Sequence, residues 1–451
     1  MKPLFPLPLN SIERFHFYDD DPAFPNNFFG RIHFAGRLNT VLVRQAFEIA
    51  SCRHVWGNVT VTRNNNALHW KQQDGLTPDL RIIEAEHEMD VESCTAINPE
   101  RESPARFVVV VGNDESTLTV QAHHAMSDGL GGIQFLRDWM LIYDNLVNER
   151  AADFNLSEVD PQSLKRRGIV GASGWRYWKH AWKQPLALFG AAKFVWRRFA
   201  VLGGQSQNQV SDALSGFPCI LDRQLNRDTL NRIRAFTVKH QVPLNSFLCA
   251  SLFQSIAAQL SPEQMKQCIR MISPISIRDR DDARLPAANR TTLVQLDRFE
   301  REMNDAVGLA KGITFELGLI RNWFLDRWFL LTIRGISISE RWLRRTASSK
   351  RPRATTLFTN LGKAFLKTGL QHQDRKLVCG GLRVDKIVLA PPIRSYLPIS
   401  FASIQYAGEL TLSAHLDLRF LSLDSGNKIM DDWLKRLHDA AIESTIVGVP
   451  T

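Results

Sequence analysis

The amino-acid sequence predicts a mixed α/β protein made of two halves. At 451 residues the chain exceeds the roughly 250–300 residues at which a single hydrophobic core stops growing. Helical and strand patterns alternate through residues 1–150 and again through 211–451. The stretch between them, 151–210, is irregular and then basic and rich in Trp. We therefore expect one lobe at 1–150, a connecting segment at 151–210 and a second lobe at 211–451.

The first half predicts strands, a helix and a hairpin in that order. Strand patterns lie near 27–36, 56–61 and 67–71, and a helical pattern lies at 40–52. Two further strand patterns, 107–111 and 117–122, are joined by the turn-forming sequence GNDES, which predicts a β-hairpin. After residue 128, apolar residues recur at helical spacing: Leu130, Ile133, Leu136, Met140 and Tyr143.

The second half repeats the mixture of helices and strands. Helices are expected at 226–240 and 243–260, and Asn245 and Ser246 suit an N-terminal cap of the second helix. A long helical region is expected to end near Arg345, and a final amphipathic helix covers 431–442. The remaining strand patterns are at 268–277, 291–296, 353–360, 382–390, 398–408 and 409–418.

The net charge of +10 comes from two short segments. Residues 174–204 contain six basic side chains and no acidic one, and 321–353 contain nine basic side chains against Asp326 and Glu340. The rest of the chain is mildly acidic and carries no motif that reads bases. We therefore expect no nucleic-acid partner.

The cysteines and the apolar runs indicate the compartment. The six cysteines are scattered, with no CxxC pair and no His at metal-ligand spacing, which predicts free thiols and no zinc site. The first eight residues hold three prolines, which interrupt the apolar stretch that a secretory signal needs. No apolar run approaches the ~18 residues that span a bilayer. A cytoplasmic location follows as the expectation.

The sequence HHAMSDG, residues 123–129, lies where a predicted strand meets a predicted helix. Side chains alternate along a strand, so the rings of His123 and His124 are expected to point in opposite directions. Adjacent strand positions do not readily bring both rings to one metal ion, and we expect no metal here. His124 continues an apolar face, where burial favours the neutral imidazole, a capable general base if it faces a cavity. The alternative is a core histidine bonded to a backbone carbonyl.

The glycines and the aspartate favour the functional interpretation. Gly129, Gly131 and Gly132 keep side chains away from the corner and leave room for a substrate or a second backbone segment. Asp128 lies at the N-cap or first turn of the following helix, where free N–H groups favour a carboxylate. A purely capping role for Asp128 stays open.

These residues carry a resemblance. HHAMSDG resembles the HHxxxDG motif of the CoA-dependent acyltransferase superfamily, which includes chloramphenicol acetyltransferase, condensation domains of peptide synthetases and bacterial wax ester synthase/diacylglycerol acyltransferases. The resemblance implies two chloramphenicol-acetyltransferase-like α/β lobes in a V, with a central tunnel that reaches the second histidine. It also implies His124 as the catalytic base, with His123, Asp128 and Gly129 supporting it. For His123, a packing role is an open alternative.

Stretches in the second half are also similar to this superfamily. SPISIRDRDD at 273–282 and ANRTTLVQL at 288–296 resemble a strand, an Arg-bearing turn and an Asn-containing strand of condensation-type members. In that family the motif Asp pairs with an Arg of the second lobe, so Arg278 is the expected structural partner of Asp128, and Arg280 the second candidate. Ser276 and Asn360, the latter in FTNLG, are the expected tunnel-lining residues. The helix at 243–260 is similar to the wax ester synthase branch.

The resemblance implies direct acyl transfer without a bound cofactor. His124 would take the proton of a hydroxyl or amine acceptor as it attacks an acyl-CoA or acyl carrier protein thioester. The first hypothesis is a CoA-dependent O-acyltransferase of lipid metabolism, acting on a long-chain alcohol, diacylglycerol or a related acceptor. The alternatives are a stand-alone condensation-type enzyme that uses a carrier-bound thioester, and a non-catalytic relative. The DFGWG segment of the plant branch is absent.

The basic segments raise the possibility of a membrane partner. Trp175, Trp178 and Trp182 recur at helical spacing with Lys and Arg between them, as in a helix lying at a lipid surface. Such contact with the inner membrane face would suit a lipid substrate. The alternative is that these aromatic rings belong to the core. The other tryptophans of the two basic segments are Trp196, Trp323, Trp328 and Trp342.

Overall fold

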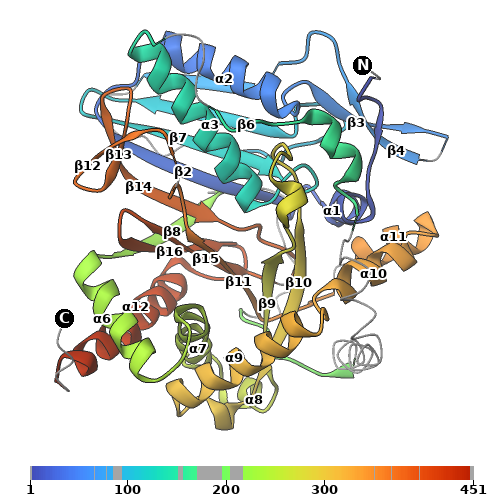
Figure 1. Cartoon of the computed structure of the whole chain (residues 1–451). Coiled ribbons are helices and arrows are strands. Elements are labelled where there is room, and N and C mark those ends of the chain that lie inside the picture. Colours follow the sequence, from blue (N-terminus) through green and yellow to red (C-terminus); the bar gives the residue numbers. More distant parts are fainter. Residues whose placement is uncertain are drawn as a thin grey trace.

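A computed structural model describes the chain at residues 3–65, 67–77, 79–84, 94–150, 156–169, 196–203, 217–349, 351–366, 368–395 and 397–446. It confirms the mixed α/β class, because two mixed sheets form two lobes (Figure 1). A third, small sheet joins three strands beside the first lobe: β1 (Leu7–Pro8), β4 (Ala67–Gln72) and β3 (Val59–Asn64).

The first lobe is built on a seven-stranded sheet. Its strands, in spatial order, are β12 (Gln371–Gln373), β13 (Lys376–Cys379), β14 (Leu382–Ala390), β2 (Asn27–Ala35), β7 (Glu115–His123), β6 (Ala105–Val111) and β5 (Asp79–Glu84). β6 and β7 form the predicted antiparallel hairpin, with Val111 opposite Ser116. β14 pairs with β2, so strands from late in the chain complete the sheet of the first half. The divisions at 1–150 and 211–451 do not predict this exchange.

Two helices pack on the first sheet and fix the position of the HHAMSDG corner. They are α2 (Thr40–His54) and α3 (Gly129–Val147). The ring of Phe47 on α2 lies 4.5 Å from Phe107 and 5.1 Å from Trp139 on α3, measured between centroids. Trp139 is fully buried. Because these large rings share one core, α3 is held rigidly against α2 and the sheet.

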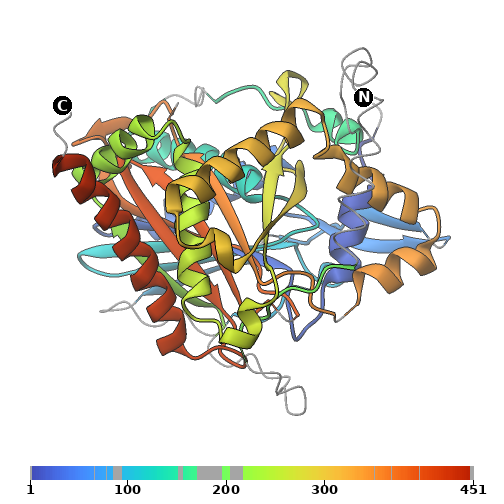
Figure 2. The same ribbon diagram turned by 90° about the horizontal axis from the view of Figure 1, so that it is seen from below.

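The second lobe is built on a six-stranded sheet with helices on its outer face. The strands, in order, are β10 (Thr291–Arg298), β9 (Ile269–Ser276), β11 (Thr356–Lys363), β15 (Ile399–Tyr406), β16 (Glu409–Leu416) and β8 (Cys219–Leu225). Figure 2 shows the helices from below, with α12 in red. They are α6 (Arg227–Lys239), α7 (Leu244–Ala257), α8 (Pro262–Met265), α9 (Ala306–Asn322) and α12 (Leu423–Ile446).

Three of the differences from the sequence prediction concern helices. Pro243, rather than Asn245 or Ser246, is the N-cap of α7, and the cap makes no side-chain hydrogen bond. The long helical region is divided into α9, α10 (Arg327–Ile336) and α11 (Glu340–Ala347). A break follows α9 at Phe324, whose φ is 56°, a left-handed conformation that does not continue a helix. The structure also adds α1 (Ser11–Asp19), which packs beside α10 and α11.

Candidate functional site

A cavity of about 1130 Å³ lies between the two large sheets, and the HHAMSDG corner forms part of its wall. β7 ends at His123 and α3 begins at Gly129, which matches the predicted strand-to-helix setting. The backbone N–H of His124 donates to the carbonyl oxygen of Asn26, just before β2. Further parts of the wall come from α1, α9, α10, β9, β10 and β11, and also from β2, β14, β15 and α11. Both lobes therefore contribute to one cavity.

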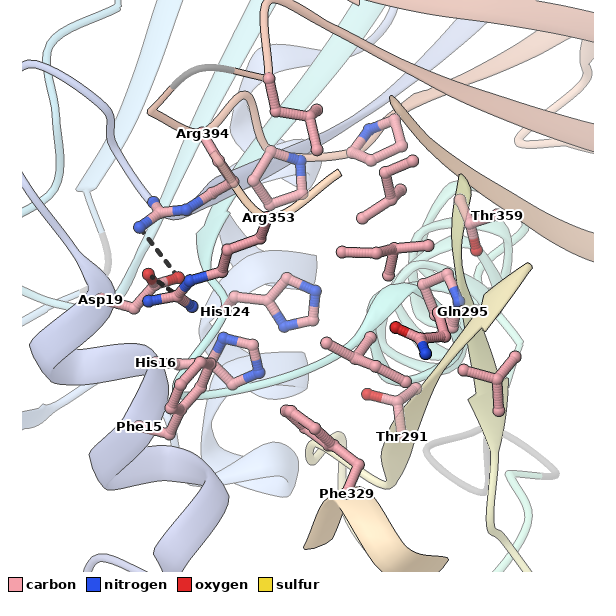
Figure 3. A pocket seen from close by; sticks show the side chains of 18 of the residues that line it. Phe15, His16, Asp19, His124, Thr291, Gln295, Phe329, Arg353, Thr359 and Arg394 are labelled. Carbon is pink, nitrogen blue, oxygen red and sulfur yellow. Dashed lines mark ion pairs between the residues drawn. The ribbon is translucent and has the colours of Figure 1, made fainter. Parts of the chain in front are cut away.

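The His124 ring lines this cavity and is held by a residue of the second lobe. Asn289 donates from Nδ2 to the carbonyl oxygen of His124 at 2.8 Å, and the same nitrogen lies 3.1 Å from the ring Nδ1. The backbone N–H and the hydroxyl of Thr291 donate to Asn289 Oδ1, which fixes the orientation of the amide. The opposite edge of the ring, with Nε2, faces the side of the pocket where Thr291, Gln295 and Thr359 lie (Figure 3).

Burial keeps the His124 ring neutral. Desolvation lowers its pKa from 6.5 to about 4, although Asp128 and a hydrogen bond to its own backbone act in the opposite direction. His123 and Arg394 lower the pKa further. The ring thus carries no charge near neutral pH, and one of its nitrogens is free to accept a proton.

Asp128, which also belongs to the cavity wall, is saturated with hydrogen bonds. Arg278 donates to its two carboxylate oxygens at 2.7 and 2.8 Å, and the backbone N–H groups of Gly131 and Arg290 donate at 2.8 and 2.7 Å. Burial alone would raise the pKa of Asp128, but these partners, Arg278 foremost, lower it below its usual 3.8. The carboxylate is the N-cap of α3 and at the same time joins the two lobes.

The sequence-predicted pair is therefore formed by Arg278 and not by Arg280. Arg278 also donates to the carbonyl oxygen of Ala288. Gly131 explains how this loop of the second lobe comes so close, since a Cβ at Gly131 would lie 2.9 Å from the same carbonyl. Gly129 is similarly close to Leu361, 3.1 Å from where its Cβ would be. The glycines thus leave room for a second backbone segment, which is one of the two roles that the sequence analysis predicts for them.

His123 points away from the cavity. Its Nδ1 accepts a hydrogen bond from the backbone N–H of Ala125 at 3.1 Å, and its Nε2 lies 3.6 Å from Asp20 Oδ1. The side chain is fully buried. Burial raises the pKa of Asp20, but His123 and the backbone N–H of Asn26 outweigh burial and lower it. The two adjacent rings thus point in different directions, as strand alternation predicts.

A second histidine at the cavity was not found from the sequence. His16 on α1 lies against His124 with the rings nearly parallel, 4.5 Å between centroids and 11° between planes (Figure 3). Ile12, Phe15, His16 and Asp19 all line the cavity. The last three follow Ile12 at distances of three, four and seven residues, which is the spacing of one face of a helix. This spacing is the signal from which the sequence could have grouped them. The sequence does not say what that face contacts.

Polar groups of the cavity wall include a half-buried ion-pair cluster and the two predicted lining residues. Asp19 pairs with Arg394 at 2.8 Å and with Arg353 at 3.5 Å (Figure 3). Burial raises the pKa of Asp19, although both guanidinium groups oppose the shift. Ser276 and Asn360 both line the cavity, and Asn360 is tied to Asn245 by a 2.9 Å hydrogen bond.

Another part of the wall is mainly apolar and comes from α9, α10 and the turn between them. Its large side chains are Leu319, Ile320, Trp323, Leu325, Trp328, Phe329, Ile333 and Ile336. Two tryptophans of the second basic segment therefore line the cavity, whereas Trp342 is 69% exposed. Trp196 is exposed too, and Trp175, Trp178 and Trp182 lie outside the described residues.

Two features are absent from the part of the chain that the structure describes. No group of three or more His, Cys, Asp or Glu side chains among them is arranged to hold a metal ion. Among the helices that the structure describes, none has the length and apolarity to cross a membrane.

Comparison with known proteins identifies the fold. No protein-family model matches the chain, and no curated protein matches its sequence. Among solved structures, a starter condensation domain of rhizomide synthetase, in complex with C8-CoA and Leu-SNAC, has a TM-score of 0.66 and 13% identity, covering 97% of this chain and 95% of its own.

Two further structures extend the comparison. Polyketide synthase associated protein 5 from Mycobacterium tuberculosis has a TM-score of 0.62 and 15% identity, over 96% of this chain and 99% of its own. The X-domain from teicoplanin biosynthesis, in complex with OxyB, has a TM-score of 0.59 and 13% identity, over 98% and 94%. Over nearly its whole length, the chain has the two-lobed fold of condensation domains.

Proposed function

We propose that the protein is an acyltransferase that moves an acyl group from a CoA thioester to a hydroxyl acceptor, with His124 as general base. The observation that carries this proposal is the neutral imidazole of His124 at the wall of a large cavity between the proposed 1–150 and 211–451 lobes. A general base must reach the acceptor proton, and a neutral ring at the cavity wall can do so.

The reaction needs a defined proton position on His124. We place the proton on Nδ1, where the residue's own carbonyl oxygen accepts it, so that Nε2 is left bare toward the cavity. The NH₂ group of Asn289 then donates to that carbonyl oxygen and not to the ring. Nε2 then takes the proton of the acceptor hydroxyl while the hydroxyl oxygen forms a bond to the thioester carbonyl carbon. When the tetrahedral intermediate collapses, the C–S bond breaks and the proton passes to the leaving thiolate. Asn289 supports this geometry by holding the carbonyl of His124.

The size and lining of the cavity favour two substrates, one of them apolar. Its volume of about 1130 Å³ exceeds the upper end of the ~300–1,000 Å³ of ordinary ligand pockets. The apolar wall of α9 and α10 suits an acyl chain or a long-chain alcohol or diacylglycerol. The solved rhizomide synthetase domain holds an acyl-CoA, which makes CoA a reasonable donor to test.

A peripheral membrane location on the cytoplasmic side is part of the same proposal. Ile338 and Trp342 are 90% and 69% exposed beside α10 and α11, near a set of exposed basic residues. These are Arg341, Arg344 and Arg345. Exposed apolar rings among cations suit anionic headgroups and would bring a lipid substrate close. The contribution of Trp175, Trp178 and Trp182 stays a prediction.

Two other functions are supported by particular comparisons. The likeness to condensation domains favours transfer from a carrier-bound thioester, with an amide or ester as product. The X-domain was solved with OxyB, a protein partner, which favours a binding module as the other alternative.

The test uses purified protein, radiolabelled palmitoyl-CoA and either hexadecanol or diacylglycerol. We expect the wild type to form ester and His124→Ala to lose about 10²–10⁴-fold in kcat, the usual contribution of a general base. His69→Ala, a change on β4 outside the cavity wall, is the matched control and should retain activity. Ester formation by His124→Ala at the wild-type rate would overturn the proposal. If product forms only from a carrier-bound donor, the carrier-dependent enzyme is favoured. If no donor gives product, the binding module is favoured.

The pH dependence gives a second readout of the same base. His124 must be unprotonated to act, and its pKa in the free protein is about 4. We therefore expect kcat/KM to stay level as the pH falls through 6.5 and to decline only as it approaches the lower value. An acid limb centred near 6.5 would show that the base is an ordinary solvated histidine.

A further inference from the structure

His16 occupies a position that packing alone does not explain. It lies on α1, whose capping box joins Asn10 and Glu13 and fixes the start of the helix. Tyr18 on the same helix donates a hydrogen bond to Glu340 of α11, so α1 is also tied to α11. The His16 side chain is thereby held at the cavity directly beside His124.

Hydrogen bonds determine which nitrogen of His16 carries the proton. Nδ2 of Asn26 lies 3.2 Å from the carbonyl oxygen of His16, 3.5 Å from Asp19 Oδ2 and 3.1 Å from His16 Nδ1. A carbonyl and a carboxylate only accept hydrogen bonds, so the amide presents its NH₂ group to all three. A hydrogen on Nδ1 would point at this NH₂ group, so we place the proton of the neutral His16 ring on Nε2. At His124 the hydrogen bond from the ring to its own carbonyl favours the other tautomer.

The ring is neutral for the same reason as its neighbour. Burial lowers the pKa of His16 well below 6.5, and electrostatic interactions with His124, His123, Arg394 and Arg353 lower it further. Two stacked imidazoles so close together cannot both be charged without strong repulsion. The pair thus presents complementary edges: His124 offers a bare nitrogen, and His16 offers an N–H.

We propose that His16 donates a hydrogen bond from Nε2 to the thioester carbonyl oxygen as that oxygen becomes an oxyanion. The inference rests on the proposed acyl transfer and adds the donor that the reaction needs. Both Nε2 edges face the same region of the cavity in Figure 3. The hydroxyl oxygen of the acceptor would lie beside Nε2 of His124. The thioester carbonyl oxygen, which becomes negatively charged, would lie beside Nε2 of His16. His16 keeps its proton throughout, while His124 receives and returns one.

The test separates hydrogen-bond donation from ring packing. His16→Phe keeps a flat ring against His124 but has no donor, whereas His16→Gln places an amide N–H close to the position of Nε2. We expect His16→Phe to lower kcat by about 10²–10³-fold, the usual loss for one oxyanion donor, with little change in KM. His16→Gln should recover at least part of that loss. His69→Phe is the control for a histidine-to-phenylalanine change elsewhere.

The outcomes distinguish this inference from the proposed function. A His16→Phe protein that keeps near-wild-type kcat, while His124→Ala is inactive, would overturn the donor role and leave the acyltransferase proposal intact. Equal losses in His16→Phe and His16→Gln at unchanged Tm would also overturn it, because a restored N–H then has no effect. Failure of every thioester donor would overturn both proposals.

A readout without turnover tests the proton position directly. In protein labelled with ¹⁵N-histidine, long-range ¹H–¹⁵N spectra distinguish the two neutral tautomers, and His16→Gln assigns the signal. We expect the proton of His16 on Nε2 near neutral pH. A proton on Nδ1 would overturn the inference whatever the assay shows, because Nε2 would then have no hydrogen to donate.

Discussion

The two sides of the corner at residues 123–129 differ in how their polar groups are satisfied. On the anchored side, Asp128 accepts four hydrogen bonds, and His123 accepts one from Ala125 and lies near Asp20. On the cavity side, His124 and His16 are stacked neutral rings whose Nε2 edges face open space. Within the motif, Asp128 helps to hold the two lobes together, whereas His124 faces the cavity.

This contrast teaches that partners, more than residue type, separate a structural group from a reactive one. A buried carboxylate with four donors is fixed in charge and position, so it is poorly suited to exchange protons. A buried imidazole whose Nε2 has no hydrogen-bond partner among the described residues can exchange a proton. Changes on the anchored side should therefore reduce stability, and changes on the cavity side should reduce activity.

The largest effect expected on the anchored side comes from Asp128→Ala. It leaves the Arg278 guanidinium without its bidentate partner and removes the N-cap of α3. Breaking such a buried pair costs about 3–5 kcal/mol in the free energy of unfolding. Urea denaturation measures the loss.

The matched control is Glu263→Ala, which breaks an exposed pair with Lys266 and should cost less than about 1 kcal/mol. If Asp128→Ala unfolds like the wild type but has lost catalysis, then Asp128 belongs to the chemistry and the contrast between the two sides fails.

The sequence predicted most of the regular structure because long amphipathic patterns are local. The hairpin of β6 and β7, the helix after Asp128 and the boundaries of β14 all follow from spacing and turn residues. It did not predict that β14 joins β2, since the pairing of strands about 350 residues apart leaves no local signal. The pair Asp128–Arg278 came from the resemblance and not from periodicity.

The missed residues of the site share one physical cause. His16 lies on a helix of nine residues, a short pattern beside a Pro-rich start, and its importance depends on contact with His124. Asn289 acts through the backbone carbonyl of His124, and Arg290 contributes its own backbone N–H to Asp128. Every residue has a backbone carbonyl, and nearly every residue has a backbone N–H. Residue types alone therefore cannot reveal which of these backbone groups takes part in a hydrogen bond.

Acid should destabilise the protein through its neutral buried histidines. Four have lowered pKa values, chiefly from burial: His16, His54, His124 and His415. In the unfolded chain each titrates near 6.5, so between that pH and the folded-state pKa only the unfolded state is protonated. Stability from these groups is therefore level above pH 6.5 and falls as the pH decreases, by about 1.4 kcal/mol per pH unit for each group.

Urea unfolding at about pH 7 and pH 5.5 measures this slope. Asp19 and Asp326 have pKa values raised by burial, and their protonation in the folded state opposes part of the loss. His124→Gln removes one titrating group, so its slope should be smaller by about one proton, or ~1.4 kcal/mol per pH unit. Equal stability at both pH values would mean that these rings are solvated or charged in the folded protein.

The smallest effect tests the two histidines of the motif against each other. His123→Phe removes the acceptor for the Ala125 N–H and the partner of Asp20, both in a fully buried setting. Leaving such groups unsatisfied costs about 1–3 kcal/mol, and kcat should change less than about 10-fold because the ring does not reach the cavity. Adding Asp20→Asn to His123→Phe should cost less than the sum of the two single changes, because the pair is already broken. A His123→Phe protein of wild-type stability that loses activity as severely as His124→Ala would assign His123 to the reaction.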